Sequence, residues 1–167
     1  MKVDLHVHTT ASDGTESPAE VVARAKSLGL GAVAITDHDT LEGVGPALVA
    51  GRHFNIEVLP GIELGTEFLG EEMHILGYLV DLDNLRFLEK LKIFRGTRIN
   101  RMEKMVEKLQ DLGCPVEMKR VLAIAGGGSV GRPHLAAALV EAGLVETTSE
   151  AFEQYIGAGR PAYVPRF

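Results

Sequence analysis

The sequence has a single cysteine, Cys114, which excludes an internal disulfide framework and fits a reducing compartment. Long apolar runs are missing too: no stretch approaches the ~18 residues of a membrane-spanning helix, and the N-terminus lacks the apolar core of a signal peptide. Basic residues are outnumbered, since 17 Lys and Arg against 23 Asp and Glu leave a formal net charge of -6. We therefore expect a cytoplasmic protein with no membrane contact and no extended surface for duplex nucleic acid.

The sequence also lacks internal repeats and a P-loop. Its glycine-rich stretch AGGGSVGRP, residues 125–133, contains no Gly-Lys-Ser/Thr, so we interpret it as a flexible turn and not as a nucleotide cradle. What the chain does have is an apolar fraction of 46% over 167 residues. That is enough for one domain with its own hydrophobic core.

The beginning of the chain alternates between strand and helix patterns. In residues 2–8, apolar and polar side chains alternate with a period of two, so His6 and His8 lie on one face of a strand. The stretch Ser17-Pro18-Ala19-Glu20 then combines an N-cap serine, a proline in the first helical turn and a capping-box glutamate. It predicts a helix that ends at Gly29.

Three more strands and one more helix are predicted before residue 81. The strands are the apolar run 32–35, the stretch IEVLPGIEL ending at Glu63, and MHILGYLV at 73–80, with a helix near 46–53. Strand, helix, strand, helix, strand and a further strand is the order that predicts the α/β class with a parallel sheet or barrel.

After Asp81 the pattern becomes helical. Apolar residues recur at helical spacing from Ile99 to Leu112, a second helix is predicted to start at Pro133, and a third is predicted to be capped by Ser149. We therefore divide the chain into an N-terminal barrel part with most candidate ligands (1–83), a helical cap or insertion (84–158) and a return segment to the barrel (159–167).

Metal-binding residue types collect at the ends of the predicted strands. Because the carboxyl ends of parallel strands meet at one face, side chains placed there converge. Neutral imidazole and carboxylate together form the ligand set of zinc, manganese or iron. The residues concerned are His6 and His8 at the end of the first strand, Asp37 and His38 at the end of the second, Glu63 at the end of the third, and His74 within the fourth.

Most of these residues also have a structural explanation. His6 and His8 could form a hydrogen-bonded pair in the core, and Asp13 before Gly14 suits a turn. Asp37 could cap the following segment, and for it we favour a supporting role over direct ligation. The same supporting role is expected for Asp39. His74 could be a core histidine whose ring nitrogens are hydrogen-bonded within the protein. His53 is expected to be exposed. Glu63 is harder to explain, since an apolar strand has little reason to end in an acid.

Several stretches resemble a known family. DLHVHTTASDGT, ITDHDT, PGIEL and HILGY resemble the first motifs of the PHP (polymerase and histidinol phosphatase) domain family. GRPHLAAALVEAGLV and YIGAGRPAYVP resemble its branch of small bacterial phosphoesterases, which includes nucleoside 3',5'-bisphosphate phosphatase and 5'-3' exoribonuclease activities. The resemblance covers essentially the whole chain. It implies a distorted seven-stranded, TIM-like β/α barrel, present here only in its N-terminal part, with an inserted helical cap.

The resemblance further implies up to three divalent metal ions, manganese, zinc or iron, and hydrolysis of nucleotide or short oligonucleotide phosphate esters by a metal-bridged hydroxide. Carried onto this chain, the ligands are His6 and His8 for one metal, Glu63 as a bridge to a second metal bound by His74, and Asp13 and His38 for a third. The candidate catalytic residues are Glu63, Asp37 and His134.

Basic side chains are candidates for binding the substrate phosphate. GRPH places Arg132 and His134 at a predicted helix start, where free backbone N–H groups favour anions. Arg95, Arg98 and Arg101 on the preceding helix could add charge, and a solvated helix face is the alternative for each of these three arginines.

This sequence differs from the family pattern at its C-terminal end, and the difference leaves other functions possible. The family pattern continues past Phe167 into strands with further ligands, and the six candidate ligands here cannot saturate three ions. We expect a C-terminally truncated chain whose sheet edge favours self-association or complementation by the missing half. A histidinol-phosphatase-like enzyme and a non-catalytic metal-binding or assembly module are the alternative functions.

Overall fold

The computed structural model describes residues 2–69 and 71–166, so residues 1, 70 and 167 of the predicted segments lie outside it. The chain divides into two compact units, Met1–Arg95 and Gly96–Phe167. We call them the first and the second unit. The boundaries that we place at 83 and 158 rest on the sequence and stay predictions.

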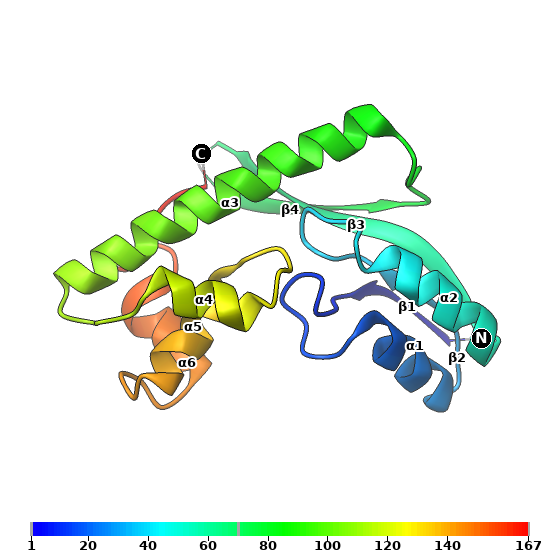
Figure 1. The fold of residues 1–167 in the computed structure, drawn as a ribbon, viewed down its shortest axis with the longest axis horizontal. Helices are drawn as coiled ribbons and strands as arrows, with labels where there is room; N and C mark the ends of the chain where they lie inside the picture. Colours follow the sequence, from blue (N-terminus) through cyan, green and yellow to red (C-terminus); the bar gives the residue numbers. More distant parts are fainter. Residues whose placement is uncertain (1, 70, 167) are drawn as a thin grey trace. The chain divides into compact units, whose positions relative to one another are not determined.

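The first unit is a mixed α/β structure (Figure 1). Its four strands pair in the order β1-β2-β3-β4, with β1, β2 and β3 parallel and β4 antiparallel to β3. The elements are β1 (Lys2–Val7), α1 (Pro18–Ser27), β2 (Leu30–Ile35), α2 (Val44–Phe54), β3 (Glu57–Phe68) and β4 (Glu71–Tyr78).

Local sequence signals account for these elements and for their core. The predicted capping box opens α1: the Ser17 hydroxyl accepts the amide of Glu20, whose carboxylate accepts the amide of Ser17. The apolar faces of α1 and α2 then form one core with β2, which is buried from Ala32 to Ile35. Residues of this core include Val21, Val22, Ala25, Val33, Ile35, Val44, Ala47 and Ala50.

The sheet is curled, so its two outermost strands approach each other. Although β1 and β4 are at opposite ends of the strand order, the Tyr78 hydroxyl on β4 donates a hydrogen bond of 2.9 Å to the carbonyl of Leu5 on β1. A flat sheet of four strands would hold these strands about 14 Å apart. The described strands therefore form a curled half-barrel.

Two expectations about the third and fourth strands are wrong. Glu63 does not end its strand, because β3 continues to Phe68, and β4 does not run parallel to the others. The reason is shared: β3 and β4 form an antiparallel ladder in which Glu63 pairs with Leu76 and Gly65 with His74. His74 thus reaches the site from a neighbouring antiparallel strand and not from the end of a parallel one.

The second unit is helical. Helix α3 (Leu85–Asp111) spans both units and begins well before the expected first apolar position, Ile99. It is followed by α4 (Met118–Ala125), α5 (Arg132–Glu141), α6 (Thr148–Ala151) and a π-helical turn, η1 (Phe152–Ile156). The core of this unit centres on Met105, Leu109, Val121, Leu135 and Leu139, each 0% exposed.

The structure of this unit differs from the expectation at two helices. Helix α4 was not expected, and no side chain caps its start at Glu117. The helix expected to be capped by Ser149 is capped by Thr147, whose hydroxyl accepts the amide of Glu150. Among the described helices, none is long and apolar enough to cross a membrane.

Candidate metal centre

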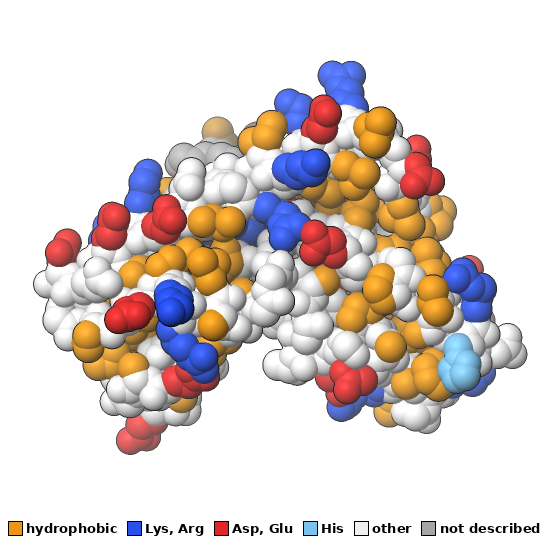
Figure 2. All heavy atoms as spheres, in the orientation of Figure 1, with side chains coloured by type: hydrophobic (Ala, Val, Ile, Leu, Met, Phe, Trp, Pro, Cys, Tyr) orange, Lys and Arg blue, Asp and Glu red, His pale blue; other side chains and the backbone are white. Residues whose placement is uncertain are grey.

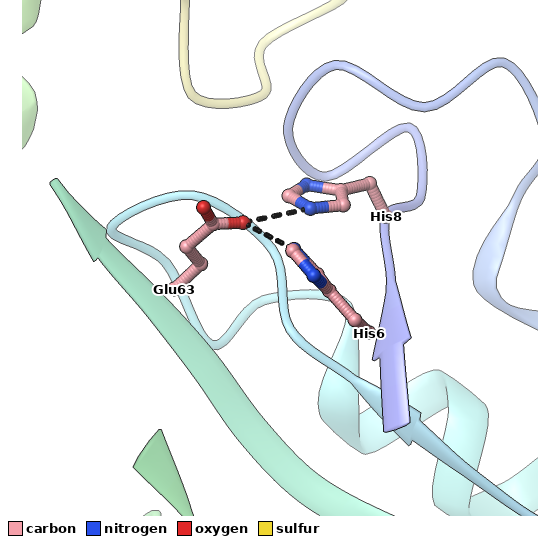
Figure 3. A group of neighbouring side chains, drawn as sticks. All are labelled: His6, His8 and Glu63. Atoms are coloured by element: carbon pink, nitrogen blue, oxygen red, sulfur yellow. Dashed lines mark hydrogen bonds and ion pairs between the residues drawn. The ribbon is translucent and has the colours of Figure 1, made fainter. Parts of the chain in front are cut away.

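Glu63 lies at the centre of a group of histidines in the first unit. Its side chain is 4% exposed, and its Oε2 atom lies 2.7 Å from Nε2 of His6 and 2.9 Å from Nε2 of His8. Figure 3 shows both rings directed at the same carboxylate oxygen. The other oxygen, Oε1, lies 2.5 Å from Nδ1 of His74. One buried carboxylate therefore meets three imidazoles.

Asp13 and His38 extend this group on the side of His8. Nδ1 of His8 lies 3.2 Å from Oδ1 of Asp13, and Nε2 of His38 lies 3.7 Å from Oδ2 of the same carboxylate. Nδ1 of His38 lies 3.8 Å from Oε2 of Glu63. The structure thus brings together the six predicted metal ligands, which we call the histidine-carboxylate cluster: His6, His8, Asp13, His38, Glu63 and His74.

The cluster contains three overlapping sets of potential ligands. In each set, one donor atom from every residue lies within 4.8 Å of the others. Glu63, His8 and His38 each belong to two sets, but only Glu63, which has two oxygens, could serve two ions, because a neutral imidazole has one acceptor nitrogen. Among the described residues the sets are His6, His8 and Glu63; His8, Asp13 and His38; and His38, Glu63 and His74.

The charges in the cluster reinforce one another. Burial alone raises the pKa of Glu63, but the hydrogen bond with His6 and the charges of the other histidines bring it below its ordinary value. Burial alone lowers the pKa of His8, yet the contact with Asp13 and the nearby carboxylates leave it raised. The pKa of His74 is raised chiefly by the carboxylate of Glu72, whose Oε1 lies 3.8 Å from Nε2 of the ring, against the effect of burial. Without metal, the positive charge of protonated His8 and His74 offsets the negative charge of the carboxylates. Divalent cations could supply that positive charge at the same place.

The donor set fits divalent transition metals. Imidazole nitrogen and carboxylate oxygen are the ligands that zinc, manganese and iron take in proteins. His8 and His74 must release their protons before they can ligate an ion. The cluster is therefore a candidate metal centre by the chemistry of its donors as well as by their distances.

A tight turn returns Asp13 to His8. The carbonyl of Thr9 accepts the amides of Ser12 and Gly14, both at 3.0 Å. A side chain at position 14 would not fit, because a Cβ there would lie 2.4 Å from the carbonyl oxygen of His8. The polar residues after β1 are thus folded back onto the end of their own strand.

Asp37 and Asp39 lie outside the three ligand sets. Asp37 is 0% exposed and contacts Thr9 and Ser12. Asp39, also 0% exposed, has a left-handed backbone with φ of 53°, and its carboxylate accepts the amide of Gly65 at 3.3 Å. Sequence reasoning did not identify Thr9 and Ser12, although both belong to the hydroxyl-rich stretch that follows His8.

Four of the five predicted phosphate-binding residues belong to the second unit, and the fifth, Arg95, belongs to the first. His134 is 7% exposed, and its Nδ1 accepts the amide of Gly131 at 2.9 Å, so a neutral ring carries its proton on Nε2. The guanidinium of Arg132 lies over the rings of Phe152 and Tyr163, with centroid distances of 5.6 and 5.7 Å.

The two arginines on α3 also lie in the second unit. Arg101 is 9% exposed, donates to the carbonyl of Val164 at 2.8 Å and lies 5.4 Å from the centroid of Tyr163. Arg98 is half-buried. The roles of Arg98, Arg101, Arg132 and His134 stay predictions.

A separate apolar hollow lies beside the first turns of α3, where hydrophobic side chains gather in Figure 2. Its volume is about 520 Å³. Arg95, which forms an ion pair with Glu42, lines it together with that residue. The leucines in its wall are Leu41, Leu82, Leu85, Leu88 and Leu91. With this lining the hollow offers no donor set like that of the histidine-carboxylate cluster.

The sequence is similar to a known family model and to curated bacterial proteins. The model for the PHP domain matches residues 4–155. A "5'-3' exoribonuclease" of Haemophilus influenzae is 37% identical over 98% of this chain, and the "5'-3' exoribonuclease Rnm" of Escherichia coli is 35% identical over 97%. A "3',5'-nucleoside bisphosphate phosphatase" of Chromobacterium violaceum is 30% identical over 97%. The chain spans 59%, 56% and 57% of the length of these three relatives.

Two solved structures share the fold. A Bifidobacterium adolescentis protein assigned as a metal-dependent phosphoesterase superposes with a TM-score of 0.92 at 36% identity, over 99% of this chain and 58% of its own. An amidohydrolase from Chromobacterium violaceum, with bound sulfate and no metal, superposes with a TM-score of 0.90 at 30% identity, over 98% of this chain and 58% of its own.

Proposed function

The chain belongs to the PHP domain family, and on this basis we propose that its protein is a metal-dependent phosphoesterase. The proposed substrates are phosphate esters of nucleotides or short oligonucleotides. The main support is the histidine-carboxylate cluster, in which Glu63, His8 and His38 each belong to two of the three ligand sets. The names of the relatives, an exoribonuclease and a nucleoside bisphosphate phosphatase, support the substrate class.

The proposed ligand assignment follows the three sets of the cluster. His6 and His8 would hold one ion, Glu63 would serve that ion and a second one held by His74, and Asp13 and His38 would hold a third. Manganese, zinc and iron all suit these donors. Such ions polarise phosphoryl oxygens, activate water near neutral pH and stabilise the leaving oxygen. The contribution of Glu63 is to hold His6, His8 and His74 around one buried negative charge.

We assign the substrate phosphate to residues of the second unit. Arg132 and His134 stand in the first turn of α5, and Arg98 and Arg101 stand on α3. The hydrogen bond from Gly131 directs the proton of a neutral His134 to Nε2, where it can be donated to a phosphate oxygen or to a leaving group. The support is the burial of this histidine and of Arg101, since buried cationic and donor groups favour an anionic partner.

We also propose that the half-barrel is part of a seven-stranded barrel and that the helices of the second unit form a cap inserted in it. The curl that brings Tyr78 to Leu5 supports a closed barrel. In the described sheet β1 and β4 are the outer strands, so their free edges can pair with further strands. We propose self-association or complementation in trans as a consequence of these two outer edges.

Release of inorganic phosphate from a nucleoside 3',5'-bisphosphate in the presence of Mn²⁺ tests the proposal. We expect release by the wild type and its loss in the Glu63→Gln and His8→Ala variants. His53→Ala is the matched control, because His53 is exposed and lies outside the cluster. Equal release by all variants would refute the site. Release from histidinol phosphate alone would favour the histidinol-phosphatase alternative, and bound metal without hydrolysis of either compound would favour a non-catalytic module.

A further inference from the structure

The buried carboxylate of Asp37 holds the loop that follows β1. Its Oδ1 atom accepts the amide of Thr9 at 2.7 Å and the hydroxyl of Ser12 at 2.6 Å, and its Oδ2 atom accepts the hydroxyl of Thr9 at 2.8 Å. Asp37 and Thr9 are 0% exposed and Ser12 is 1% exposed. Hydrogen bonds to an ionised acceptor are stronger than neutral ones, and here they are shielded from water.

Ser12 connects this carboxylate to two residues of the cluster. Its hydroxyl oxygen lies 3.4 Å from Nδ1 of His8 and 3.4 Å from Oδ1 of Asp13. The hydroxyl proton is directed to Asp37, which is the nearest acceptor at 2.6 Å. Asp37 therefore determines where Ser12 lies between His8 and Asp13.

The main chain of the same segment is bonded to the backbone of Glu63. The carbonyl of Asp37 accepts the amide of Glu63 at 3.2 Å, and the amide of Asp39 donates to the carbonyl of Glu63 at 3.0 Å. His38 stands between these two bonds and pairs with Glu63 as an isolated bridge. One short segment is thus bonded to the Asp13 loop through the Asp37 side chain and to Glu63 through its backbone.

Gly43 covers this carboxylate from another side. A Cβ atom at position 43 would lie 2.4 Å from Oδ2 of Asp37 and 2.9 Å from the hydroxyl oxygen of Thr9. The φ of Gly43 is -72°, which any residue adopts, so the reason for glycine here is space and not backbone conformation. Packing this close leaves no room for a side chain at position 43.

We infer that Asp37 is a positioning residue for the ion assigned to Asp13 and His38, and that it acts through Thr9 and Ser12 without touching the ion. The inference rests on the proposed function, because it assigns a role to Asp37 in the same metal centre. Groups that orient the ligands of a metal in this way contribute to its affinity. The direct ligands keep their identity when Asp37 changes, but Asp13 loses its fixed place.

Mn²⁺ binding to the 167-residue chain tests the inference, with free Mn²⁺ measured by electron paramagnetic resonance. We expect Asp37→Asn to weaken the binding of one ion about 10- to 100-fold and to leave the others unchanged. In the Asp13→Asn background, Asp37→Asn should produce no further loss, because both changes act on the same ion. Thr9→Ser, which keeps the hydroxyl, should bind like the wild type, whereas Thr9→Val should bind like Asp37→Asn.

A control variant and a substitute variant separate a positioning role of Asp37 from a general loss of structure. Thr40→Val removes another buried threonine hydroxyl, one that accepts the amide of Glu42 and is not bonded to Asp37, and should leave Mn²⁺ binding unchanged. If Asp37→Asn does not fold, as judged by circular dichroism, Ser12→Ala replaces it in the double-mutant comparison with Asp13→Asn.

Three results would overturn the inference. Asp37→Asn could bind Mn²⁺ like the wild type, or it could weaken the binding of all ions equally. The third result is that Asp37→Asn weakens Mn²⁺ binding further in the Asp13→Asn background. The proposed function fails separately, if the wild type binds no Mn²⁺, and the inference then fails with it.

Discussion

Nδ1 of His74 on β4 lies 2.5 Å from Oε1 of Glu63 on the neighbouring strand β3. The antiparallel ladder creates this contact, because it pairs His74 with Gly65, two positions from Glu63 on the same face. A histidine from outside the parallel strands is thereby added to the cluster.

Removing this histidine should affect one ligand set only. His74→Ala takes away a donor from the set of His38, Glu63 and His74 and leaves the other two sets intact. We expect the loss of one Mn²⁺ per chain, or a fall in its affinity of at least 10-fold, measured by equilibrium dialysis. His53→Ala should bind as many ions as the wild type. Loss of all ions in His74→Ala would show that the three sets are not separate.

The packing of Gly43 against Asp37 predicts the effect of a single methyl group. Gly43→Ala should lower the free energy of unfolding by about 1–3 kcal/mol, since the new Cβ would meet Oδ2 of Asp37 at 2.4 Å. Gly45→Ala is the matched control in the first turn of α2, where a Cβ has nothing within 4 Å. That change should be neutral or stabilise by about 0.4–1 kcal/mol. Urea denaturation of both variants checks the contrast, and equal stabilities would contradict it.

The cluster should make the stability of the metal-free chain depend on pH. His8 and His74 have a pKa raised above 6.5, so their contribution to stability is complete below pH 6.5 and is lost as the pH rises through their folded values. Glu63 has a pKa lowered from 4.5, so its contribution is present above pH 4.5 and is lost as the pH falls. With EDTA present, the cluster should stabilise the fold most between pH 4.5 and 6.5.

Mn²⁺ affinity should follow the opposite trend above pH 6.5, because an ion competes with the protons on His8 and His74. Denaturation midpoints with EDTA and Mn²⁺ titrations across the same pH range measure both effects. A metal-free His8→Ala chain should lose part of the pH dependence. An unchanged pH profile in that variant would show that His8 does not contribute.

The sequence was sufficient to predict the first strand and the start of the first helix. The alternation in residues 2–8 places His6 and His8 on one face because side chains in any strand alternate with a period of two. The capping box at Ser17 was equally local and is present in the structure. Such features depend on neighbours within a few residues, which is why they are visible in a single sequence.

Strand direction and strand length could not be predicted in the same way. Apolar alternation is identical in parallel and antiparallel strands, so nothing in MHILGYLV shows that β4 runs against β3. Glu63 was placed at a strand end because its acid followed an apolar run, but the ladder with β4 extends β3 to Phe68. The decisive interaction is the pairing of two strands, which the sequence of either one does not contain.

In the second unit, the sequence contains a signal for the start of α6 but none for the start of α4. Thr147 is followed by Glu150 at the spacing of a capping box, and this pair determines the helix start more clearly than Ser149 does. Helix α4, in contrast, is short and has no side-chain cap at Glu117. Its burial on α5 through residues such as Val121 stabilises it, and that contact is tertiary.

Burial in the second unit also gives a stability prediction. Leu139 on α5 is 0% exposed, so Leu139→Ala should lower the free energy of unfolding by about 2–5 kcal/mol. Leu122 on α4 is 42% exposed and serves as the matched control, with an expected loss below about 1 kcal/mol. Denaturation of the two variants under the same conditions measures the difference. Similar losses would show that the helical core is not centred on Leu139.

The most direct test of the account is the number of Mn²⁺ ions bound by the wild type and by Glu63→Gln, measured by equilibrium dialysis with folding checked by circular dichroism. Glu63 belongs to two of the three ligand sets and contacts His6, His8 and His74. We predict that the folded Glu63→Gln chain loses two ions, or binds them about 100-fold more weakly, and retains the ion of Asp13 and His38. Undiminished Mn²⁺ binding by Glu63→Gln would contradict a metal centre built around this carboxylate.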